Sequence, residues 1–300
     1  MNEKKVSLLV QRQRNTRRVA GIFLAPVTIL LMIYILYPIL NTFYTSGFKW
    51  NGISADKINI GLDNWITLIG DKSFWIGFKN NLLIMVLSIS IQIPIGLALA
   101  TFLDFGGKKL TIFKVIWFIP LLMSSVAIGF LFNYTLATNG GIVSTISNLF
   151  RGGNVDLLGN PKTALFAVIG VICWQFIPFY MVYFMAAFTI IPFDVFEAAR
   201  IDGATRGQYF WRIALPLLVP SIKSAAILSM VGSLKYFDLI YVMTGGGPGT
   251  STELMATYMY KQSFKNFNMG YGSAVAGGMF ILITLVSLIT MKLLNRNKEA

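Results

Sequence analysis

Six long apolar stretches, separated by shorter polar segments, dominate the 300-residue chain. Each is long enough to cross about 30 Å of hydrocarbon as an α-helix. They run over residues 19–44, 78–103, 114–136, 162–190, 217–242 and 270–291. The pattern predicts an all-α membrane protein with six transmembrane helices.

Composition agrees with this pattern, since hydrophobic residues make up 55% of the chain and charged residues only 12%. The net charge of +13 is distributed unevenly among the segments between the apolar stretches. Basic residues are more frequent in the segments that include both termini (Lys4, Lys5, Arg12, Arg14, Arg17, Arg18, Lys108, Lys109, Lys114, Arg200, Arg206, Arg212, Lys292, Arg296, Lys298) than in the alternate loops (Lys49, Lys57, Lys72, Lys79, Arg151, Lys162, Lys261, Lys265). This asymmetry predicts that both termini are cytoplasmic. The positive charge is thus explained without a nucleic-acid partner.

The apolar and polar segments divide the chain into four parts. We expect a basic cytoplasmic N-terminus (1–18), a first transmembrane helix with its outer loop (19–77), a five-helix core (78–292) and a cytoplasmic tail (293–300). The first apolar stretch is too long for a signal peptide and lacks a clear cleavage site, so we expect it to be retained.

A polar segment at 192–216 separates the fourth and fifth apolar stretches, and residues 197–216 read EAARIDGATRGQYFWRIALP. Asp194 and Glu197 have the spacing of a capping box, which predicts a helix that starts there. Gly203 is expected to end that helix in the left-handed conformation. A second short helix is predicted from about Thr205 to Ile213, with Pro216 in the first turn of the fifth spanning helix.

The same segment carries more apolar side chains than a solvated linker needs. Ala198 and Ala199 would let a facing surface approach the helix closely, and charged side chains would form its rim (Glu197, Arg200, Asp202, Arg206). Residue pattern alone leaves two interpretations open: a docking surface, or aromatic side chains placed in the membrane interface.

The residues of this segment resemble the conserved cytoplasmic loop in membrane subunits of ATP-binding-cassette (ABC) importers. That pattern is EAA (Glu197, Ala198, Ala199), a glycine after three residues (Gly203) and a hydrophobic residue before proline (Leu215, Pro216). The similarity to the maltose-type sugar permease subfamily extends over GLDNW (61–65), FIPLLMSSVAIGF (118–130), TGGGPGTSTELMATYMYKQSF (244–264) and NMGYGSAVAGGM (268–279).

The resemblance implies a type I ABC importer permease fold in a bacterial cell membrane. It implies that the loop forms a coupling helix that inserts into a cleft of a cytoplasmic ATPase, with Glu197, Ala198, Ala199, Asp202, Gly203 and Arg206 as the coupling residues. It also implies a second homologous permease subunit, two ATP-binding subunits and an extracytoplasmic solute-binding protein. The extra N-terminal segment favours a heterodimer of permeases, and a homodimer is the alternative.

Nucleotide binding is not expected on this chain, because it contains no GxxxxGK[ST] phosphate loop. We expect it to bind no cofactor and to depend on ATP and Mg²⁺ held by the separate ATPase subunit. The glycine-rich stretch at 244–252 lacks a lysine, and we interpret it as a flexible outer loop.

Polar and aromatic positions inside the spans are candidates for a sugar pathway, because sugars present hydroxyl groups and apolar ring faces together. Four residues form one stripe of the fifth helix: Ser229, Gly232, Ser233 and Tyr236. The fourth helix adds Trp174, Gln175 and Phe179, and the third adds Ser125. The alternative is that Ser and Gly serve close helix packing.

Lys235 and Asp238 are spaced as an ion pair on the fifth helix and raise the alternative of an anionic substrate such as a phosphorylated polyol. A secondary active transporter is a further alternative, although no carboxylate lies at mid-membrane. An enzyme would need a cluster of catalytic residues within the spans, and the sequence shows none. The sequence therefore predicts half of the translocation pathway of a sugar importer.

Overall fold

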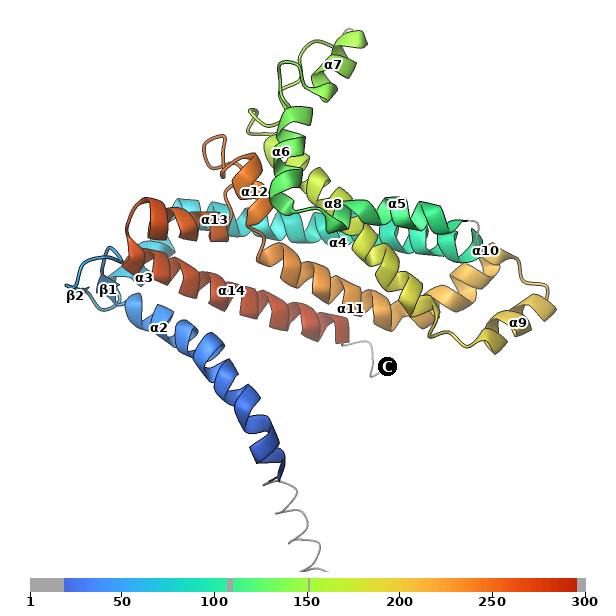
Figure 1. The fold of residues 1–300 in the computed structure, drawn as a ribbon, viewed down its shortest axis with the longest axis horizontal. Helices are drawn as coiled ribbons and strands as arrows, with labels where there is room; N and C mark the ends of the chain where they lie inside the picture. Colours follow the sequence, from blue (N-terminus) through green and yellow to red (C-terminus); the bar gives the residue numbers. More distant parts are fainter. Residues whose placement is uncertain (1–18, 107–109, 151, 296–300) are drawn as a thin grey trace, which may run out of the picture.

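The computed structural model describes residues 19–106, 110–150 and 152–295 (Figure 1). The basic residues of the predicted N-terminus, with Lys108, Lys109, Arg151, Arg296 and Lys298, lie outside the described residues. After a helical start at Val19, the elements in chain order are η1 (Met32–Leu36), α2 (Tyr37–Thr45), β1 (Phe48–Lys49), β2 (Ile58–Asn59), α3 (Asp63–Gly70), α4 (Lys72–Gly106), α5 (Thr111–Leu122), α6 (Ser125–Thr135), α7 (Ile142–Leu149), α8 (Ala164–Phe188), α9 (Phe193–Ile201), α10 (Arg206–Tyr209), η3 (Phe210–Ala214), α11 (Leu215–Leu234), α12 (Asp238–Met243), α13 (Met255–Tyr260), η4 (Lys261–Lys265) and α14 (Met269–Asn295).

Five helices in the described part of the chain are long and apolar enough to cross a membrane: Val19–Thr45, Lys72–Asp104, Ala164–Phe188, Arg206–Leu234 and Met269–Leu294. They overlap the first, second, fourth, fifth and sixth predicted spans. The all-α prediction is confirmed, since the only sheet among the described residues is the two-stranded antiparallel pair β1–β2.

The third predicted span is not one helix. It consists of α5 and α6, whose axes are bent by 96° relative to each other. Met123 is extended, with ψ of 145°, and Ser124 caps α6 by accepting a hydrogen bond from the Val126 N–H at 3.3 Å. Serine is a favoured N-cap residue, so Ser124 lets a new helix start at Ser125. The apolar pattern did not reveal this break, because the residues on both sides of it are apolar.

The fifth predicted span is shifted toward the N-terminus. Its helix starts at Arg206, passes through the π-helical turn η3 and ends at Leu234, whereas the apolar pattern predicted an end near Val242. The predicted second short helix therefore does not stand alone, because α10, η3 and α11 are continuous. Pro216 lies in the first turn of α11, where the widened π turn precedes it.

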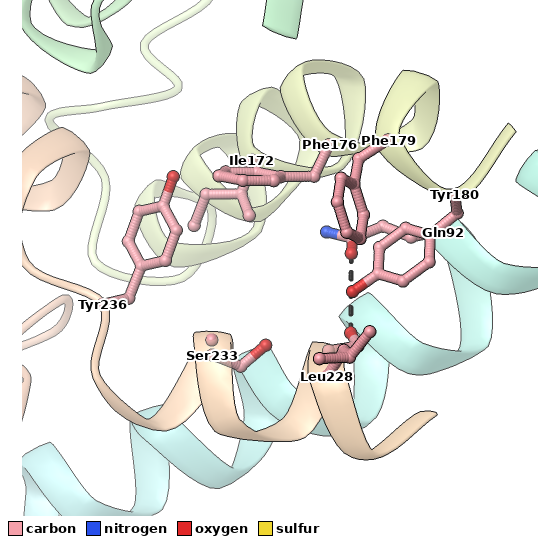
Figure 2. A pocket seen from close by; sticks show the side chains of 10 residues that line it. Gln92, Ile172, Phe176, Phe179, Tyr180, Leu228, Ser233 and Tyr236 are labelled. Carbon is pink, nitrogen blue, oxygen red and sulfur yellow. Dashed lines mark hydrogen bonds between the residues drawn. The ribbon is translucent and has the colours of Figure 1, made fainter. Parts of the chain in front are cut away.

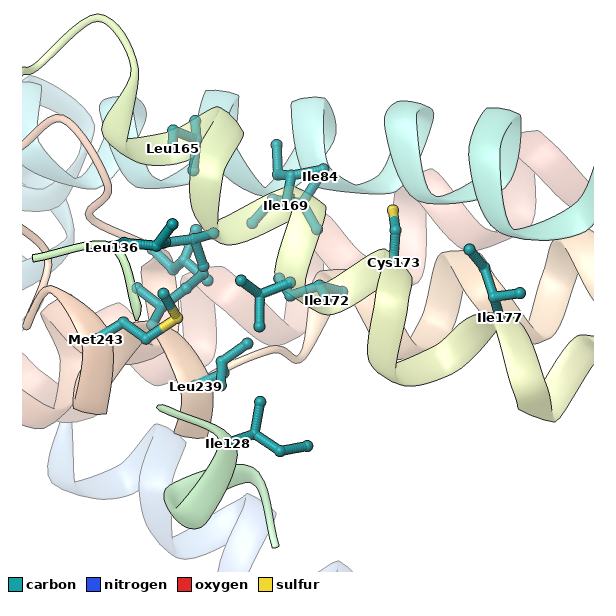
Figure 3. Close-up of a cluster of buried hydrophobic side chains, with 14 residues drawn as sticks. Ile84, Ile128, Leu136, Leu165, Ile169, Ile172, Cys173, Ile177, Leu239 and Met243 are labelled. Carbon is teal, nitrogen blue, oxygen red and sulfur yellow. The ribbon is translucent and has the colours of Figure 1, made fainter. Parts of the chain in front are cut away.

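The helices pack around α8, which is apolar on all sides and mostly buried. α4 and α5 pack along α8, and α11 packs along α4. Figure 3 shows the main cluster of buried side chains, where α8 meets Ile84 of α4, Ile128 of α6 and Leu239 of α12. A second cluster joins α4, α8 and α11 to α9 and α10.

The two ends of the molecule are formed by different kinds of structure (Figure 1). α9 lies at one end, while β1, β2, α3 and α13 lie at the opposite end. The first helix leans away from the rest, and none of its apolar window is buried within the chain. The part of the helix within this window must meet lipid or another protein, whereas its C-terminal part, α2, packs against α14.

The glycine-rich stretch, residues 244–252, is closed by hydrogen bonds and differs from the flexible loop predicted from its sequence. The Thr244 and Thr252 hydroxyls are 2.7 Å apart, and the Thr252 hydroxyl donates to the Gly247 carbonyl at 2.8 Å. Thr252 is fully buried. These hydrogen bonds within the stretch hold the loop in a defined conformation.

Candidate functional site

The polar segment between α8 and α11 contains the predicted helix, with a different start. α9 begins at Phe193 after Pro192, and no side chain caps it. The predicted Asp194–Glu197 capping box is therefore absent, because Pro192 holds the N-cap position. Asp194 still lies in the first turn, where a carboxylate interacts favourably with the helix dipole.

Gly203 ends α9 as predicted. Its φ of +76° lies in the left-handed region. The Gly203 N–H donates to the Arg200 carbonyl at 3.1 Å, and the Ala204 N–H donates to the Ala199 carbonyl at 2.9 Å. This pair of bonds is the Schellman motif, in which glycine has the lowest conformational cost.

The next helix begins with a capping box that the sequence analysis missed. The Thr205 hydroxyl accepts from the Gln208 N–H at 3.3 Å, and the Gln208 side chain accepts from the Thr205 N–H at 2.8 Å. The Thr-x-x-Gln spacing is a recognised signal for this arrangement. The two motifs hold the turn between α9 and α10 through local backbone geometry.

Only part of the α9 surface faces outward. Glu197, Ala198 and Asp202 are exposed, whereas Ala199 is only 6% exposed and packs in the cluster that contains Tyr209. The expectation that both alanines face a partner is wrong for Ala199, which lies on the inner side of the helix. Large apolar side chains nevertheless remain exposed around the turn (Phe193, Ile201, Trp211).

A cavity of about 220 Å³ lies between α4, α8 and the end of α11 (Figure 2). Its lining combines aromatic rings, hydroxyl groups, one amide and aliphatic side chains. The lining residues are Gln92, Ile172, Phe176, Phe179, Tyr180, Leu228, Ser229, Gly232, Ser233 and Tyr236. This cavity brings together all four residues of the stripe predicted on the fifth span, three from α11 and Tyr236 from just after it, with Phe179 from α8.

Comparison with known proteins identifies the family. Residues 92–299 match the family model described as "Binding-protein-dependent transport system inner membrane component". The chain belongs to this family. It is therefore a membrane component of a transport system. The matched region of this permease includes every residue that lines the cavity, whereas the first spanning helix lies outside it.

Individual relatives agree with this assignment. The "Putative ABC transporter permease protein ORF1" of Caldicellulosiruptor sp. (strain Rt8B.4) is 61% identical over 140 residues, which is 47% of this chain and 100% of that protein. The "Multiple sugar-binding transport system permease protein MsmF" of Streptococcus mutans is 31% identical over 90% of this chain and 93% of its own length.

A solved structure shares the fold. A chain of the bacterial alginate ABC transporter, solved in complex with an alginate pentasaccharide-bound periplasmic protein, superposes with a TM-score of 0.78. The two chains are 22% identical, and the match covers 96% of this permease and 98% of that chain. The permease therefore has the fold of an ABC importer membrane chain, as the sequence resemblance implied.

Gln175 and Ser125, two other predicted pathway residues, lie one layer behind the cavity wall. The Tyr236 hydroxyl donates to Gln175 Oε1 at 3.4 Å, and Gln175 Nε2 donates to Ser125 Oγ at 3.4 Å. Trp174 points elsewhere and packs against Phe132, with ring centroids 5.2 Å apart. Trp174 therefore does not line the cavity.

Gln92 is a cavity residue that the sequence analysis did not single out. Gln92 points toward the end of α11 (Figure 2), and its Oε1 accepts from the Ser229 hydroxyl at 3.5 Å. Gln92 Nε2 lies 3.9 Å from the Cys173 sulfur. An amide in an apolar span needs hydrogen-bond partners, so its presence in α4 was a usable signal. Ile172, Phe176, Tyr180 and Leu228 gave no such signal, because apolar and aromatic residues are common in every span.

The cavity lining carries no ionisable group that is charged at neutral pH. Lys235 and Asp238 are exposed and lie outside it, and no ion pair joins them in the described structure. The predicted pair on one helix is wrong, because α11 ends at Leu234, Lys235 is its C-cap and Asp238 starts α12.

Proposed function

We propose that this permease forms half of the translocation pathway of an ABC importer for an uncharged sugar or oligosaccharide. The observation that carries the proposal is the cavity between α4, α8 and α11. Its aromatic rings suit the apolar faces of a sugar ring, and its hydroxyl and amide groups suit sugar hydroxyls. The names of relatives such as MsmF support the same substrate class.

An uncharged substrate is favoured over a phosphorylated polyol. A buried anion needs a partner of opposite charge, because desolvation of an unpaired charge is costly. No Lys or Arg lines the cavity, and Lys235 lies outside it. The argument for an anionic substrate depended on Lys235 as a cation in the pathway, and the position of Lys235 outside the cavity does not support it.

Energy would come from a separate ATPase subunit that holds ATP and Mg²⁺ and docks on the exposed side of α9. The helix from Arg206 to Leu234 starts at this loop and carries Ser229 and Ser233 at its far end. At 1.5 Å per residue this helix is about 40 Å long, so a movement of the loop would be transmitted along it to the cavity. In this proposal α9 lies on the cytoplasmic side and both termini are cytoplasmic.

Two further partners belong to the proposal. A second, homologous permease subunit would complete the pathway and contact the first helix, whose apolar window has no buried residue within this chain. A solute-binding protein would deliver the sugar to the end that carries β1, β2 and α13. The family description and the periplasmic protein in the alginate complex support this partner.

Uptake by cells that express the complete transporter tests the function. Radiolabelled maltose, trehalose and raffinose are compared with glycerol 3-phosphate, under ATP depletion and under a protonophore. We expect uptake of at least one neutral sugar that stops on ATP depletion and continues with the protonophore while ATP is maintained. Uptake of glycerol 3-phosphate alone, or uptake driven by the proton gradient, contradicts the proposal.

Orientation has its own test. Thr205 and Thr250 are both exposed. The first lies in the turn between α9 and α10 and the second between α12 and α13, toward opposite ends of the molecule (Figure 1). In a Cys173→Ser background, a membrane-impermeant thiol reagent added to intact cells should label Thr250→Cys and not Thr205→Cys. Labelling of Thr205→Cys from outside would place α9 away from any cytoplasmic ATPase.

A further inference from the structure

The segment that connects α12 to α13 is anchored by a buried charge. Glu253 is only 2% exposed, and its carboxylate accepts from Lys261 Nζ at 2.5 Å and from the Thr257 hydroxyl at 2.6 Å. Because a buried carboxylate requires such partners, this segment is held in one arrangement. We call residues 244–257 the glycine loop.

The glycine loop rests on α4. A Cβ added at Gly77 would lie 2.8 Å from the Met255 nitrogen, so only glycine allows this close approach of the two backbones. Asn80 follows one turn later, and its Nδ2 donates to the Ser251 carbonyl at 3.0 Å and the Glu253 carbonyl at 2.9 Å. α4 therefore holds the loop at several neighbouring positions.

Asn81 differs from Asn80 because it holds two elements at once. It is fully buried, and its Oδ1 accepts from the Met255 N–H of the glycine loop at 3.1 Å. Its Nδ2 donates to the carbonyls of Ser233 and Leu234, at 3.2 and 3.3 Å. One amide thus connects the glycine loop to the end of α11.

The end of α11 needs such a partner. The last carbonyls of a helix lack the usual intrahelical donor, and a buried carbonyl without a donor is costly. The Ser233 carbonyl also accepts from the Tyr236 N–H, at 3.4 Å, so Asn81 is its second donor. Ser233 and Leu234 are both buried. Ser233 lines the cavity, and Tyr236 follows directly after the helix end. The position of these two cavity residues therefore depends on how the helix end is held.

We propose that Asn81 is a positioning residue that couples the glycine loop to the cavity by fixing the end of α11. A displacement of the loop changes the Met255 contact and, through the same side chain, the support of Ser233 and Leu234. Asn80 touches the loop alone and provides a matched control. The functional meaning of this coupling rests on the proposed transport function, whereas the coupling itself is a property of the folded chain.

Thiol labelling of the assembled transporter in membranes tests the coupling without any substrate. The reporter is Ser233→Cys in a Cys173→Ser background, and the probe is N-ethylmaleimide. A buried cysteine reacts only when its surroundings open locally, so the rate measures that opening. Ser229→Cys, one turn earlier in the same helix and cavity, is the control reporter.

We expect Asn81→Ala to raise labelling of Ser233→Cys about fivefold, the effect of losing a typical net hydrogen bond. Asn80→Ala should change it less than about twofold, and neither variant should alter labelling of Ser229→Cys. Asn81→Asp keeps the acceptor for Met255 and loses both donors to α11, so it should raise the rate as Asn81→Ala does. This variant also covers the case in which Asn81→Ala fails to assemble.

A double-mutant cycle separates coupling from local support. Lys261→Met disturbs the loop anchor and should raise labelling of Ser233→Cys when Asn81 is present, but add little in the Asn81→Ala chain. Equal effects of the Asn80 and Asn81 variants, or multiplied effects of Lys261→Met and Asn81→Ala, would overturn the proposal. Failure of sugar uptake would leave these labelling results unchanged and would count against the transport proposal alone.

Discussion

The α9 turn and the glycine loop lie toward opposite ends of the molecule (Figure 1) and are stabilised in different ways. The α9 turn is held by local hydrogen bonds, the Schellman motif at Gly203 and the capping box at Thr205, and its carboxylates at Glu197 and Asp202 are exposed. The glycine loop is held by distant residues, and its carboxylate at Glu253 is buried. The first arrangement leaves these two carboxylates exposed, whereas the second pairs its buried carboxylate with Lys261.

The largest effect should come from breaking the buried ion pair of the glycine loop. Lys261→Met leaves the Glu253 carboxylate without its cationic partner, which typically costs about 3–5 kcal/mol. We expect a clear fall in the thermal unfolding temperature of the purified transporter. Lys265→Met is the matched control, because Lys265 is exposed and forms no ion pair within the described structure. An equal fall in both variants would mean that the pair is not what holds the loop.

Gly203 tests the local arrangement at the other end. Gly203→Ala forces a side chain into the left-handed region, with a cost of about 1–2 kcal/mol. Gly207→Ala, four residues later within α10, should be neutral or slightly stabilising because alanine favours helix. Thermal unfolding of the two variants measures the difference. If they behave alike, Gly203 is not the conformational end point of α9.

Glu197 and Glu253 form a direct comparison of exposed and buried carboxylates. Glu197→Gln should change the free energy of unfolding by less than about 0.5 kcal/mol, as expected for an exposed site. It should nevertheless lower substrate-stimulated ATP hydrolysis if α9 docks an ATPase. Glu253→Gln should reduce stability, because it replaces the anionic partner of Lys261. An equal loss of stability in Glu197→Gln and Glu253→Gln would contradict the view that only the Glu253 carboxylate stabilises the fold.

A pH effect should appear near the glycine loop, where Asp71 accepts hydrogen bonds from the hydroxyls of Tyr258 and Tyr271. Burial raises the pKa of the Asp71 carboxyl, but these bonds and those from the Ser73 and Phe74 N–H groups outweigh it and lower the pKa. Burial and the Asp71 contact raise the pKa of Tyr258 to about 12. Both shifts link the stability of this end to pH.

The depressed pKa of Asp71 means that its stabilisation is present above the unfolded value of about 3.9 and is lost as pH falls through the folded value. The raised pKa of Tyr258 means that its contribution is present below about 10 and is lost as pH rises through about 12. As pH falls from 6 to 3, the unfolding temperature should decrease less steeply for Asp71→Asn than for the unchanged chain. Parallel curves would show that Asp71 does not contribute.

These differences explain which parts of the structure the sequence predicted. Gly203 and the apolar stretches act locally, so the end of α9 and most of the spans were predictable. The capping box at Thr205 was equally local and could have been found from its spacing. The breaks at Ser124 and Leu234 were not evident from hydropathy, because both flanking segments remain apolar.

The cavity was partly predictable for the same reason. Ser229, Gly232 and Ser233 share one face of α11, which spacing alone reveals, and Tyr236 lines the same cavity just beyond the helix end. Gln92 and Asn81 act through partners more than a hundred residues away in sequence, Ser229 for the first and Ser233 for the second. Such contacts depend on how α4 packs against α11, which no local pattern specifies.

The most direct test of the central claim, that the exposed side of α9 docks the ATPase, is to add bulk there and measure retention of that subunit. Ala198→Trp places a large side chain on an exposed position of α9, and Thr250→Trp does the same on the glycine loop. The account predicts that Ala198→Trp inserts normally but loses most of the co-purifying ATPase subunit and its coupled uptake, while Thr250→Trp retains the ATPase subunit fully. Full ATPase association and full uptake with Ala198→Trp would contradict it.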